Sequence, residues 1–148
     1  MSDNELERLL GELHLGSDMD EAKALCQDEP LFHIDSEGMW HYRDAPLPEK
    51  FARLFATVLV KTPDGYELRT PAERLPVSVA LYPVLVFDFC LLADGHYLLN
   101  SVVGEDYKVP ETAIQMKDKG VEIHLENGVV AGMTRACFYR YADMILVD

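Results

Sequence analysis

Turn signals that contain glycine recur along the chain from residue 36, and they constrain the fold more than any other feature. Each is flanked by β-branched or aromatic residues, which is the pattern of β-hairpins. Glycine adopts the positive φ that such turns require at little steric cost. The signals are Ser-Glu-Gly at 36–38, Pro-Asp-Gly at 63–65, Asp-Gly at 94–95, Asp-Lys-Gly at 118–120 and Asn-Gly at 127–128. They predict a strongly antiparallel sheet.

The first of these hairpins predicts which side chains face the core. With residues 36–38 as a three-residue turn, His33 lies opposite His41 and Phe32 lies opposite Tyr42. Residues that face each other across an antiparallel pair share one side of the sheet. The hairpin therefore has an apolar face of Phe32, Ile34, Trp40 and Tyr42, and a polar face of His33, Asp35, His41 and Arg43.

The second hairpin, treated in the same way, places Lys61 opposite Glu67 as a surface ion pair and Val60 opposite Leu68. Polar side chains follow where this strand leaves the turn. They are either solvated or lie along a cleft: Arg69, Thr70, Glu73 and Arg74.

Two stretches after the first hairpin have helical spacing of apolar residues. Residues 48–55 predict a short helix with Pro48 in its first turn, followed by a strand that ends at Lys61. Residues 134–147 predict either a strand or a helix capped by Thr134. The helix would bury Phe138, Tyr141 and Ile145.

The amino-terminal residues 1–28 are predicted to form a separate helical arm. Ser2 and Glu5 have the spacing of a capping box. One apolar stripe follows at helical spacing, formed by Leu6, Leu9, Leu10 and Leu13. The arm is expected to pack on the rest of the protein, and an exposed helix that binds a partner is the alternative.

Glycine spacing also indicates an internal duplication. Gly38 and Gly65 are separated by 27 residues and Gly95 and Gly120 by 25, so the two pairs are offset by 57 and 55 residues. The predicted fold is therefore α+β and mostly antiparallel β, with a duplicated core. Its parts are a helical arm at 1–28, a β-rich repeat with a short helix at 29–84, and a second β-rich repeat at 85–148.

Charge excludes several classes of partner. The net charge is −13, from 26 acidic and 13 basic residues. Nucleic acids and anionic membrane surfaces require a cationic surface, so neither is an expected partner. A small anionic ligand remains compatible with this charge, because a few arginines suffice to bind it. No signal peptide and no apolar run of about 20 residues is present, so a cytoplasmic protein is expected.

Catalytic and cofactor motifs are not found. The sequence lacks G-x-S-x-G, H-E-x-x-H, G-x-G-x-x-G and the P-loop. The three cysteines, Cys26, Cys90 and Cys137, have no zinc-type spacing and are expected to be buried, reduced thiols. We therefore expect neither an enzyme nor a cofactor. A metal-dependent enzyme that uses His33 and His41 is the weaker alternative, and solvated histidines are the simpler interpretation.

One long segment, residues 34–79, resembles a known family. Its string IDSEGMWHYRDAPLPEKFARLFATVLVKTPDGYELRTPAERLPVSV is similar to the bacterial family called domain of unknown function 1285, and RACFYRYADM at 135–144 resembles the family's ending. The matching positions are Asp35, Gly38, Trp40, Pro46, 54–56, 64–66 and 70–74. The resemblance implies two duplicated parts, the second like a pleckstrin-homology domain, with a ligand pocket between them. It further implies a nucleotide-like ligand and a role in signal transduction or stress response.

Seven residues are predicted to bind this ligand. Trp40 and Phe55 would stack on a flat ring, three arginines would bind an anionic group, and two polar residues would form hydrogen bonds. The polar members are Arg43, Arg53, Arg69, Thr70 and Glu73. Core packing for the aromatics and solvation for the arginines are the alternatives. A different functional class, a protein-interaction module that docks a basic partner on the acidic surface, is the alternative to a ligand-binding or sensory protein.

Overall fold

The structure, a computed structural model, describes residues 31–147 except residues 72 and 119. The predicted helical arm of residues 1–28 and Cys26 lie outside the described residues. Within the described part, no helix is long and apolar enough to cross a membrane.

The first half of the protein, residues 31–83, contains a six-stranded sheet and one helix. The helix α3 spans Glu49–Ala56. The strands are β1 Phe32–Ile34, β2 Trp40–Tyr42, β3 Ala45–Pro46, β4 Leu59–Thr62, β5 Gly65–Arg69 and β6 Arg74–Val79. Their order in the sheet is β3-β2-β1-β6-β5-β4.

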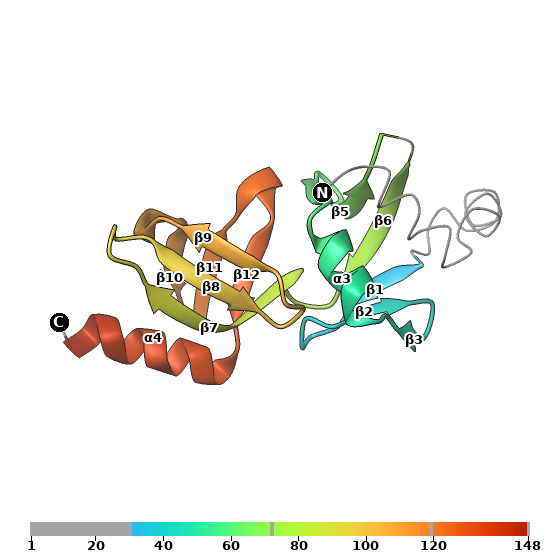
Figure 1. The fold of residues 1–148 in the computed structure, drawn as a ribbon. Coiled ribbons are helices and arrows are strands. Elements are labelled where there is room, and N and C mark those ends of the chain that lie inside the picture. The colour runs from blue at the N-terminus through green and yellow to red at the C-terminus, as the bar shows by residue number, and fades with distance from the viewer. Residues whose placement is uncertain (1–30, 72, 119, 148) are drawn as a thin grey trace.

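The second half, residues 84–147, contains another six-stranded sheet, the helix α4 and two short 3-10 helices. Figure 1 shows the two halves side by side, and α4, Arg135–Val147, lies against the second sheet. The strands are β7 Val84–Leu91, β8 Tyr97–Ser101, β9 Asp106–Val109, β10 Ile114–Lys117, β11 Gly120–His124 and β12 Val130–Met133, with η1 at Glu111–Ala113 and η2 at Glu126–Gly128. The sheet order is β10-β11-β12-β7-β8-β9.

The two sheets have the same topology, which confirms the predicted duplication. Written from the β9 edge, the order of the second sheet is β9-β8-β7-β12-β11-β10. Each strand of the second sheet then occupies the position of one strand of the first, so that β7 corresponds to β1, β8 to β2, and so on to β12 and β6. Both sheets join their first and last strands in parallel, β1 with β6 and β7 with β12, whereas the other pairs are antiparallel. The fold class is therefore α+β with two duplicated β-rich halves. The likeness of the second half to a pleckstrin-homology domain stays a prediction.

The glycines that indicated the duplication occupy equivalent turns. Gly38 and Gly95 lie in the first turn of each half with φ of 80° and 88°. Gly65 and Gly120 each begin the fifth strand of their half, with φ of 155° and 148°. These backbone conformations are rare for residues with a Cβ, which explains why glycine marks the repeat.

The first hairpin forms as predicted. Phe32 pairs with Tyr42, His33 with His41 and Ile34 with Trp40. The apolar face lies in the core, where Phe32, Ile34 and Trp40 are buried and Tyr42 is partly buried. The polar face remains accessible, as the alternation of the two strands requires.

The second hairpin has a different register from the predicted one. Thr62 pairs with Gly65, so the turn consists of the two residues 63–64 rather than three, and Val60 instead of Lys61 lies opposite Glu67. A change of one residue in turn length shifts every pair along the strands. The Lys61 ammonium donates to the Thr62 and Gly65 carbonyl oxygens. The predicted Lys61–Glu67 ion pair is therefore wrong.

Both predicted helices are confirmed, and the strand alternative for the carboxyl end is wrong. The α3 helix follows Pro48 and buries Phe51, Leu54 and Phe55. In α4, the Cys137 amide donates to the Thr134 hydroxyl at 3.3 Å, which is the predicted cap. The α4 helix places Phe138, Tyr141 and Ile145 against the core.

The two described cysteines differ in exposure. Cys137 is buried and free, as expected, and burial raises the pKa of its thiol to about 11. Cys90 is also free but is exposed. The expectation of a buried thiol is wrong for Cys90, which lies near the end of β7 where the strand is exposed.

Turns with glycines of positive φ hold the two halves together. A Cβ on Gly38 would lie 2.8 Å from Leu85 Cβ and 2.9 Å from Val102 Cγ2, both in the second half. Two glycines of the second half approach the first half as closely. A Cβ on Gly104 would lie 2.7 Å from the Glu49 carboxylate, and a Cβ on Gly128 would lie 3.0 Å from Lys61 Cβ. The turn at Gly38 therefore packs on the second half at a distance that leaves no room for a Cβ, whereas at Gly104 the Glu49 side chain could move aside.

Candidate ligand-binding site

A cavity of about 370 Å³ lies between the two halves. The first half provides one wall through Ala56, Thr57 and Leu59, where α3 ends and β4 begins. The second half provides the opposite wall through residues 106–110, on and just after β9, and through residues 124–126 and Val129 around η2. A pocket between the halves is the feature that the family resemblance implied.

The first wall is placed by the end of α3. The Thr57 hydroxyl donates to the Leu54 carbonyl oxygen at 2.6 Å, and the Thr57 amide bonds to the last turn of the helix. These contacts end the helix and turn the chain into β4. Leu59 is buried, and Val109 and Val129 of the second half, also buried, line the same cavity. The walls are consequently apolar at their most buried points.

Tyr107 lines this cavity, and its side chain carries a buried polar group. Its hydroxyl oxygen is buried and has no hydrogen-bond partner among the described residues. Burial, followed by the nearby Glu105 carboxylate, raises the pKa of Tyr107 to about 12. The phenol therefore keeps its proton at neutral pH and can donate a hydrogen bond. An unpaired buried hydroxyl costs about 1–3 kcal/mol, so an acceptor that reaches it when the wall moves would be favourable.

Charged residues of both signs surround the cavity. Lys108 lies 2.9 Å from the Asp94 carboxylate, and Asp106 accepts a hydrogen bond from Asn100 at 3.0 Å. The Lys108 ammonium, with the His96 amide, lowers the pKa of Asp94 to about 2. His124 and Glu126 also line the cavity. This mixture suits a ligand with both hydrogen-bond donors and acceptors.

The predicted stacking residues lie in the core. Trp40 and Phe55 do contact each other, with ring centroids 6.2 Å apart. Their exposed fractions are 2% and 0%, so protein atoms cover both rings. Neither ring lines the cavity between the halves.

The predicted polar residues also lie outside this cavity. Arg53 approaches Glu105 of the second half at 3.5 Å, and Arg69 pairs with Glu67 at 2.6 Å. Arg43 is exposed and lies over the Tyr42 ring. The Thr70 hydroxyl accepts a hydrogen bond from the Glu73 amide at 3.0 Å, within a turn. Ligand binding by these seven residues stays a prediction.

Sequence reasoning did not single out the residues that line the cavity. Thr57 and Tyr107 are 50 positions apart and come together only through the packing of the two halves. Tyr107 also fits an ordinary alternating strand, so its burial without a partner leaves no local signal. The family resemblance implied the interface, whereas the residues that line its cavity could be identified only from the structure.

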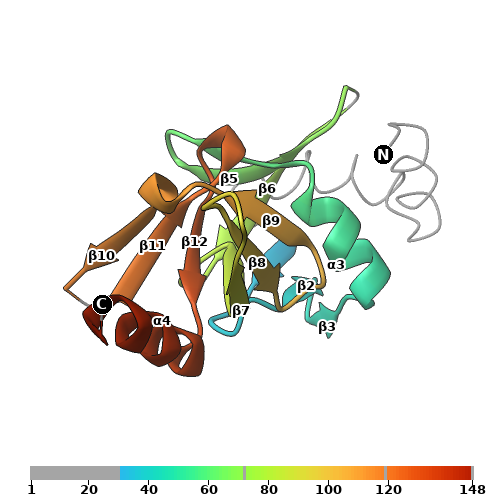
Figure 2. The ribbon, with the colours of Figure 1, turned by 60° about the vertical axis from the view of Figure 1, so that its left-hand side comes forward.

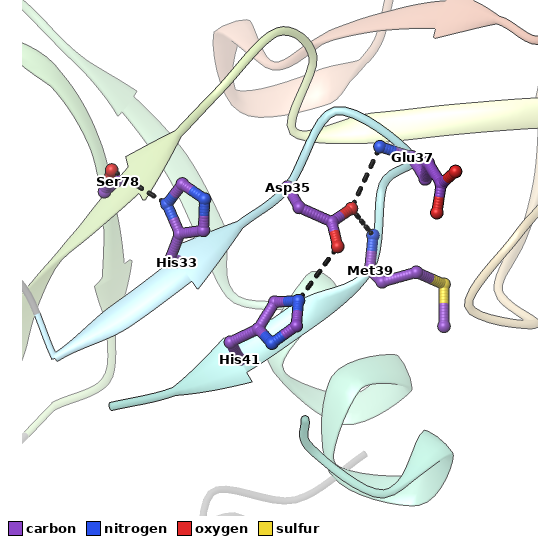
Figure 3. A network of polar contacts seen from close by, with 6 residues as sticks. All are labelled: His33, Asp35, Glu37, Met39, His41 and Ser78. Atoms are coloured by element: carbon purple, nitrogen blue, oxygen red, sulfur yellow. Dashed lines mark hydrogen bonds and ion pairs between the residues drawn. The ribbon is translucent and has the colours of Figure 1, made fainter. Parts of the chain in front are cut away.

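The polar face of the first hairpin forms two separate side-chain pairs (Figure 3). His33 lies 3.0 Å from the Ser78 hydroxyl, and His41 lies 2.9 Å from the Asp35 carboxylate. Asp35 also accepts hydrogen bonds from the Glu37 and Met39 amides, so it closes the turn. Burial alone would raise the pKa of Asp35, but the hydrogen bonds from His41 and the two amides outweigh it and lower the pKa.

These pairs bear on the predicted histidine site, and the metal-dependent enzyme stays a prediction. No group of three His, Cys, Asp or Glu side chains that could hold a metal ion occurs in the part of the chain that the structure describes. Each histidine instead has its own partner, and the two rings are 6.2 Å apart. The arrangement is that of a hairpin whose polar face is stabilised by side-chain hydrogen bonds.

Together these features define a class: an α+β protein of two duplicated sheets with a cavity between them. Residues 24–80 match the family described as "Domain of unknown function (DUF1285), N-terminal domain". The chain is also similar to the crystal structure of a DUF1285 family protein from Shewanella baltica OS155, with 34% sequence identity and a TM-score of 0.70. That likeness covers 77% of this chain and 91% of the other. The chain belongs to the DUF1285 family.

A second solved structure shares the fold. It is a DUF1285 family protein from Silicibacter pomeroyi DSS-3, with 23% identity and a TM-score of 0.65, and the likeness covers 78% of this chain and 69% of the other. No curated protein matches the chain. The family resemblance drawn from residues 34–79 is therefore confirmed, and both relatives are bacterial proteins.

Proposed function

We propose that this protein is a cytoplasmic, non-enzymatic ligand-binding protein with a sensory role, and that its ligand binds in the cavity between the halves. The observation that carries the proposal is the buried Tyr107 hydroxyl, which lacks an acceptor among the described residues at a cavity lined by both halves. The hydroxyl has almost no accessible surface, so a ligand acceptor would satisfy this donor once the wall around Tyr107 moves. The volume of about 370 Å³ falls in the range of roughly 300–1,000 Å³ that is usual for small-molecule sites.

A ligand in this position would contact both halves at once. Binding would therefore favour the arrangement in which the Thr57 wall and the Tyr107 wall are closed on the ligand. Such a coupling suits a signalling or stress-response role, because ligand occupancy would change how firmly the halves are held together.

For the ligand, we propose a nucleotide-like molecule. A flat base would contact the apolar side chains of Pro110 and Leu125, which line the cavity and are not fully buried, and its ring atoms would accept the Tyr107 hydrogen bond. Lys108 lines the same cavity and could approach an anionic group. The mixed charges of the rim limit this site to one modest anionic group rather than a long polyphosphate.

The test is a thermal-shift screen with AMP, GMP, cyclic AMP, cyclic GMP and their dinucleotides. A ligand present at 100 times its Kd stabilises the folded state by about 2.7 kcal/mol. For a chain of this size, about 1 kcal/mol raises Tm by roughly 2–4 °C, so the expected rise is roughly 5–11 °C.

Two variants test the place of binding. Tyr107→Phe removes only the hydroxyl, so the free protein should be as stable as the wild type or more stable, yet lose most of the ligand-induced shift. Thr57→Trp should fill the cavity and also abolish the shift. Thr112→Trp, on the exposed η1 helix, is the matched control and should keep it.

Two results would overturn the proposal. If no nucleotide raises Tm while the protein is pure and folded, the nucleotide-like ligand is wrong. If a shift is found and survives in both Tyr107→Phe and Thr57→Trp, the ligand binds outside this cavity.

The net charge of −13 favours a second candidate, a module that docks a basic protein partner. A complex held by this charge would dissociate as salt rises from about 0.1 to 1 M, because the Debye length shortens from about 10 to 3 Å. Pull-downs at the two salt concentrations test this candidate. A partner that is retained at about 0.1 M salt and lost at about 1 M supports it, whereas a complex that persists at about 1 M is not held by charge.

A further inference from the structure

A second concave surface lies on the second half, between α4 and the chain that connects the two sheets. This surface, which we call the α4 groove, has a volume of about 390 Å³ and is lined by residues 81–82, 120–121, 133, 135 and 138–139. It shares no lining residue with the cavity between the halves. Figure 2 shows α4 beside β12 of the second sheet, and Met133 of β12 is one of the residues that line the groove.

The walls of the α4 groove are largely apolar and accessible. Leu81 and Tyr139 have exposed fractions of 63% and 51%. The Tyr82 ring packs against Gly132 of β12, where an added Cβ would be only 2.3 Å from a carbon of the ring. Phe138, one residue before Tyr139 on α4, is partly buried against the core. Exposed apolar surface that is gathered in a groove is typical of a binding site.

Arg135 is the one charged side chain among the described residues that line this groove. Its Nε atom donates to the Tyr139 hydroxyl at 2.9 Å, and its guanidinium lies 5.7 Å from the centre of the Tyr139 ring. These contacts hold the side chain along α4. A guanidinium carries five N–H donors, so this arrangement uses one and leaves four.

The environment of Arg135 differs from that of three other arginines in the protein. Arg53, Arg69 and Arg140 each lie within ion-pair distance of a carboxylate. Among the described residues no carboxylate lies within ion-pair distance of Arg135, although acidic residues outnumber basic ones by 26 to 13. An apolar groove with an uncompensated guanidinium complements an anion that carries an apolar body.

We propose that the α4 groove binds a monocarboxylate with an apolar chain, such as a medium-chain fatty acid. The carboxylate accepts hydrogen bonds from the free edge of the Arg135 guanidinium, and the chain lies along Leu81, Tyr82 and Phe138. A single guanidinium matches a single carboxylate, whose two oxygens fit the planar fork of the arginine. The proposal concerns a site separate from the cavity between the halves and does not depend on the function proposed for it.

The test is a titration of the ¹⁵N-labelled protein with sodium decanoate below its micelle concentration, followed by amide NMR. Saturable shifts are expected at Val121, Met133 and Phe138. Octanoate and hexanoate should bind progressively more weakly, by up to about fourfold for each methylene that is lost. Decanol, which has the chain but no charge, should bind at least tenfold more weakly than decanoate, because a hydrogen bond to a charged group contributes about 1.5–3 kcal/mol.

Variants with matched controls separate the charge from the chain. Arg135→Gln should weaken decanoate at least tenfold and leave decanol unchanged, whereas Arg140→Gln, on the same helix but outside the groove, should change neither. Leu81→Glu should abolish binding of decanoate. Leu91→Glu is its control, since Leu91 is also exposed, at 53%, and lies outside the groove.

Several results would overturn the proposal. These are the absence of saturable shifts, equal binding of decanol and decanoate, or shifts centred on Thr57, Tyr107 and Leu125 of the other cavity. Sedimentation of the free protein provides one more test. A dimer that Leu81→Glu dissociates would show that a second copy of the chain covers the groove instead.

Discussion

Replacement of Gly38 by alanine tests how the two halves are held together. Gly38 lies in the first turn of the first half with φ of 80° and packs on Leu85 and Val102 of the second half. Gly95 occupies the equivalent turn of the second half with φ of 88°, and a Cβ there would have no atom within 4 Å. Gly95→Ala is therefore a control with the same backbone strain and without the contact.

The expected magnitudes follow from these two environments. An alanine in the left-handed region costs roughly 1–2 kcal/mol, and both variants carry this cost. In Gly38→Ala the new methyl would also lie 2.8 Å from Leu85 Cβ, an atom that cannot move without the backbone. Overpacking of this kind costs about 1–3 kcal/mol more. We therefore expect about 2–5 kcal/mol for Gly38→Ala and about 1–2 kcal/mol for Gly95→Ala.

Urea denaturation at 25 °C, followed by circular dichroism, measures both values. The free energy of unfolding should fall further for Gly38→Ala, by about 1–3 kcal/mol beyond the control. Equal losses in the two variants would refute the packing of the first turn on the second half. A larger loss for Gly95→Ala would refute it as well.

Two further predictions concern single side chains of the second half. Thr134→Ala should lower the free energy of unfolding by about 1 kcal/mol in urea denaturation, because the Cys137 amide loses its capping partner; Thr112→Ala, at an exposed position, should have little effect. Asp94 has its pKa lowered to about 2 by Lys108 and the His96 amide, so its carboxylate stabilises the fold above pH 4 and this contribution is lost as pH falls toward 2. The difference in free energy of unfolding between wild type and Asp94→Asn should therefore shrink as pH falls over this range. Lys108→Met should raise the Asp94 pKa toward 3.8 in an NMR titration, and an unchanged pKa would contradict the ion pair.

Much of the fold could be predicted from the sequence, for reasons that are local. The faces of the first hairpin follow from the two-residue period of a strand, and His33 does pair with His41. The duplication is visible because turns at Gly38 and Gly95 need the same backbone conformation. The second hairpin was harder, because Pro63-Asp64-Gly65 fits turns of two or three residues and only the sheet's register distinguishes them.

The candidate site could be predicted only in part. The resemblance implied a cavity between the halves, but its walls come from segments such as Thr57 and Tyr107 that no local pattern connects. Trp40 and Phe55 had the chemistry to stack on a ligand, and burial in the core covers both rings. The sequence shows which side chains are aromatic or charged, whereas their accessibility depends on the packing of the two halves.

The central claim is that a small ligand binds between the two halves. Amide NMR of the ¹⁵N-labelled protein, titrated in turn with AMP, GMP, cyclic AMP and cyclic GMP, tests it most directly. At least one of them should cause saturable shifts on both walls of the cavity, at Thr57 and Leu59 in the first half and at Tyr107 and Leu125 in the second. The absence of saturable shifts, or shifts confined to one half, would contradict it.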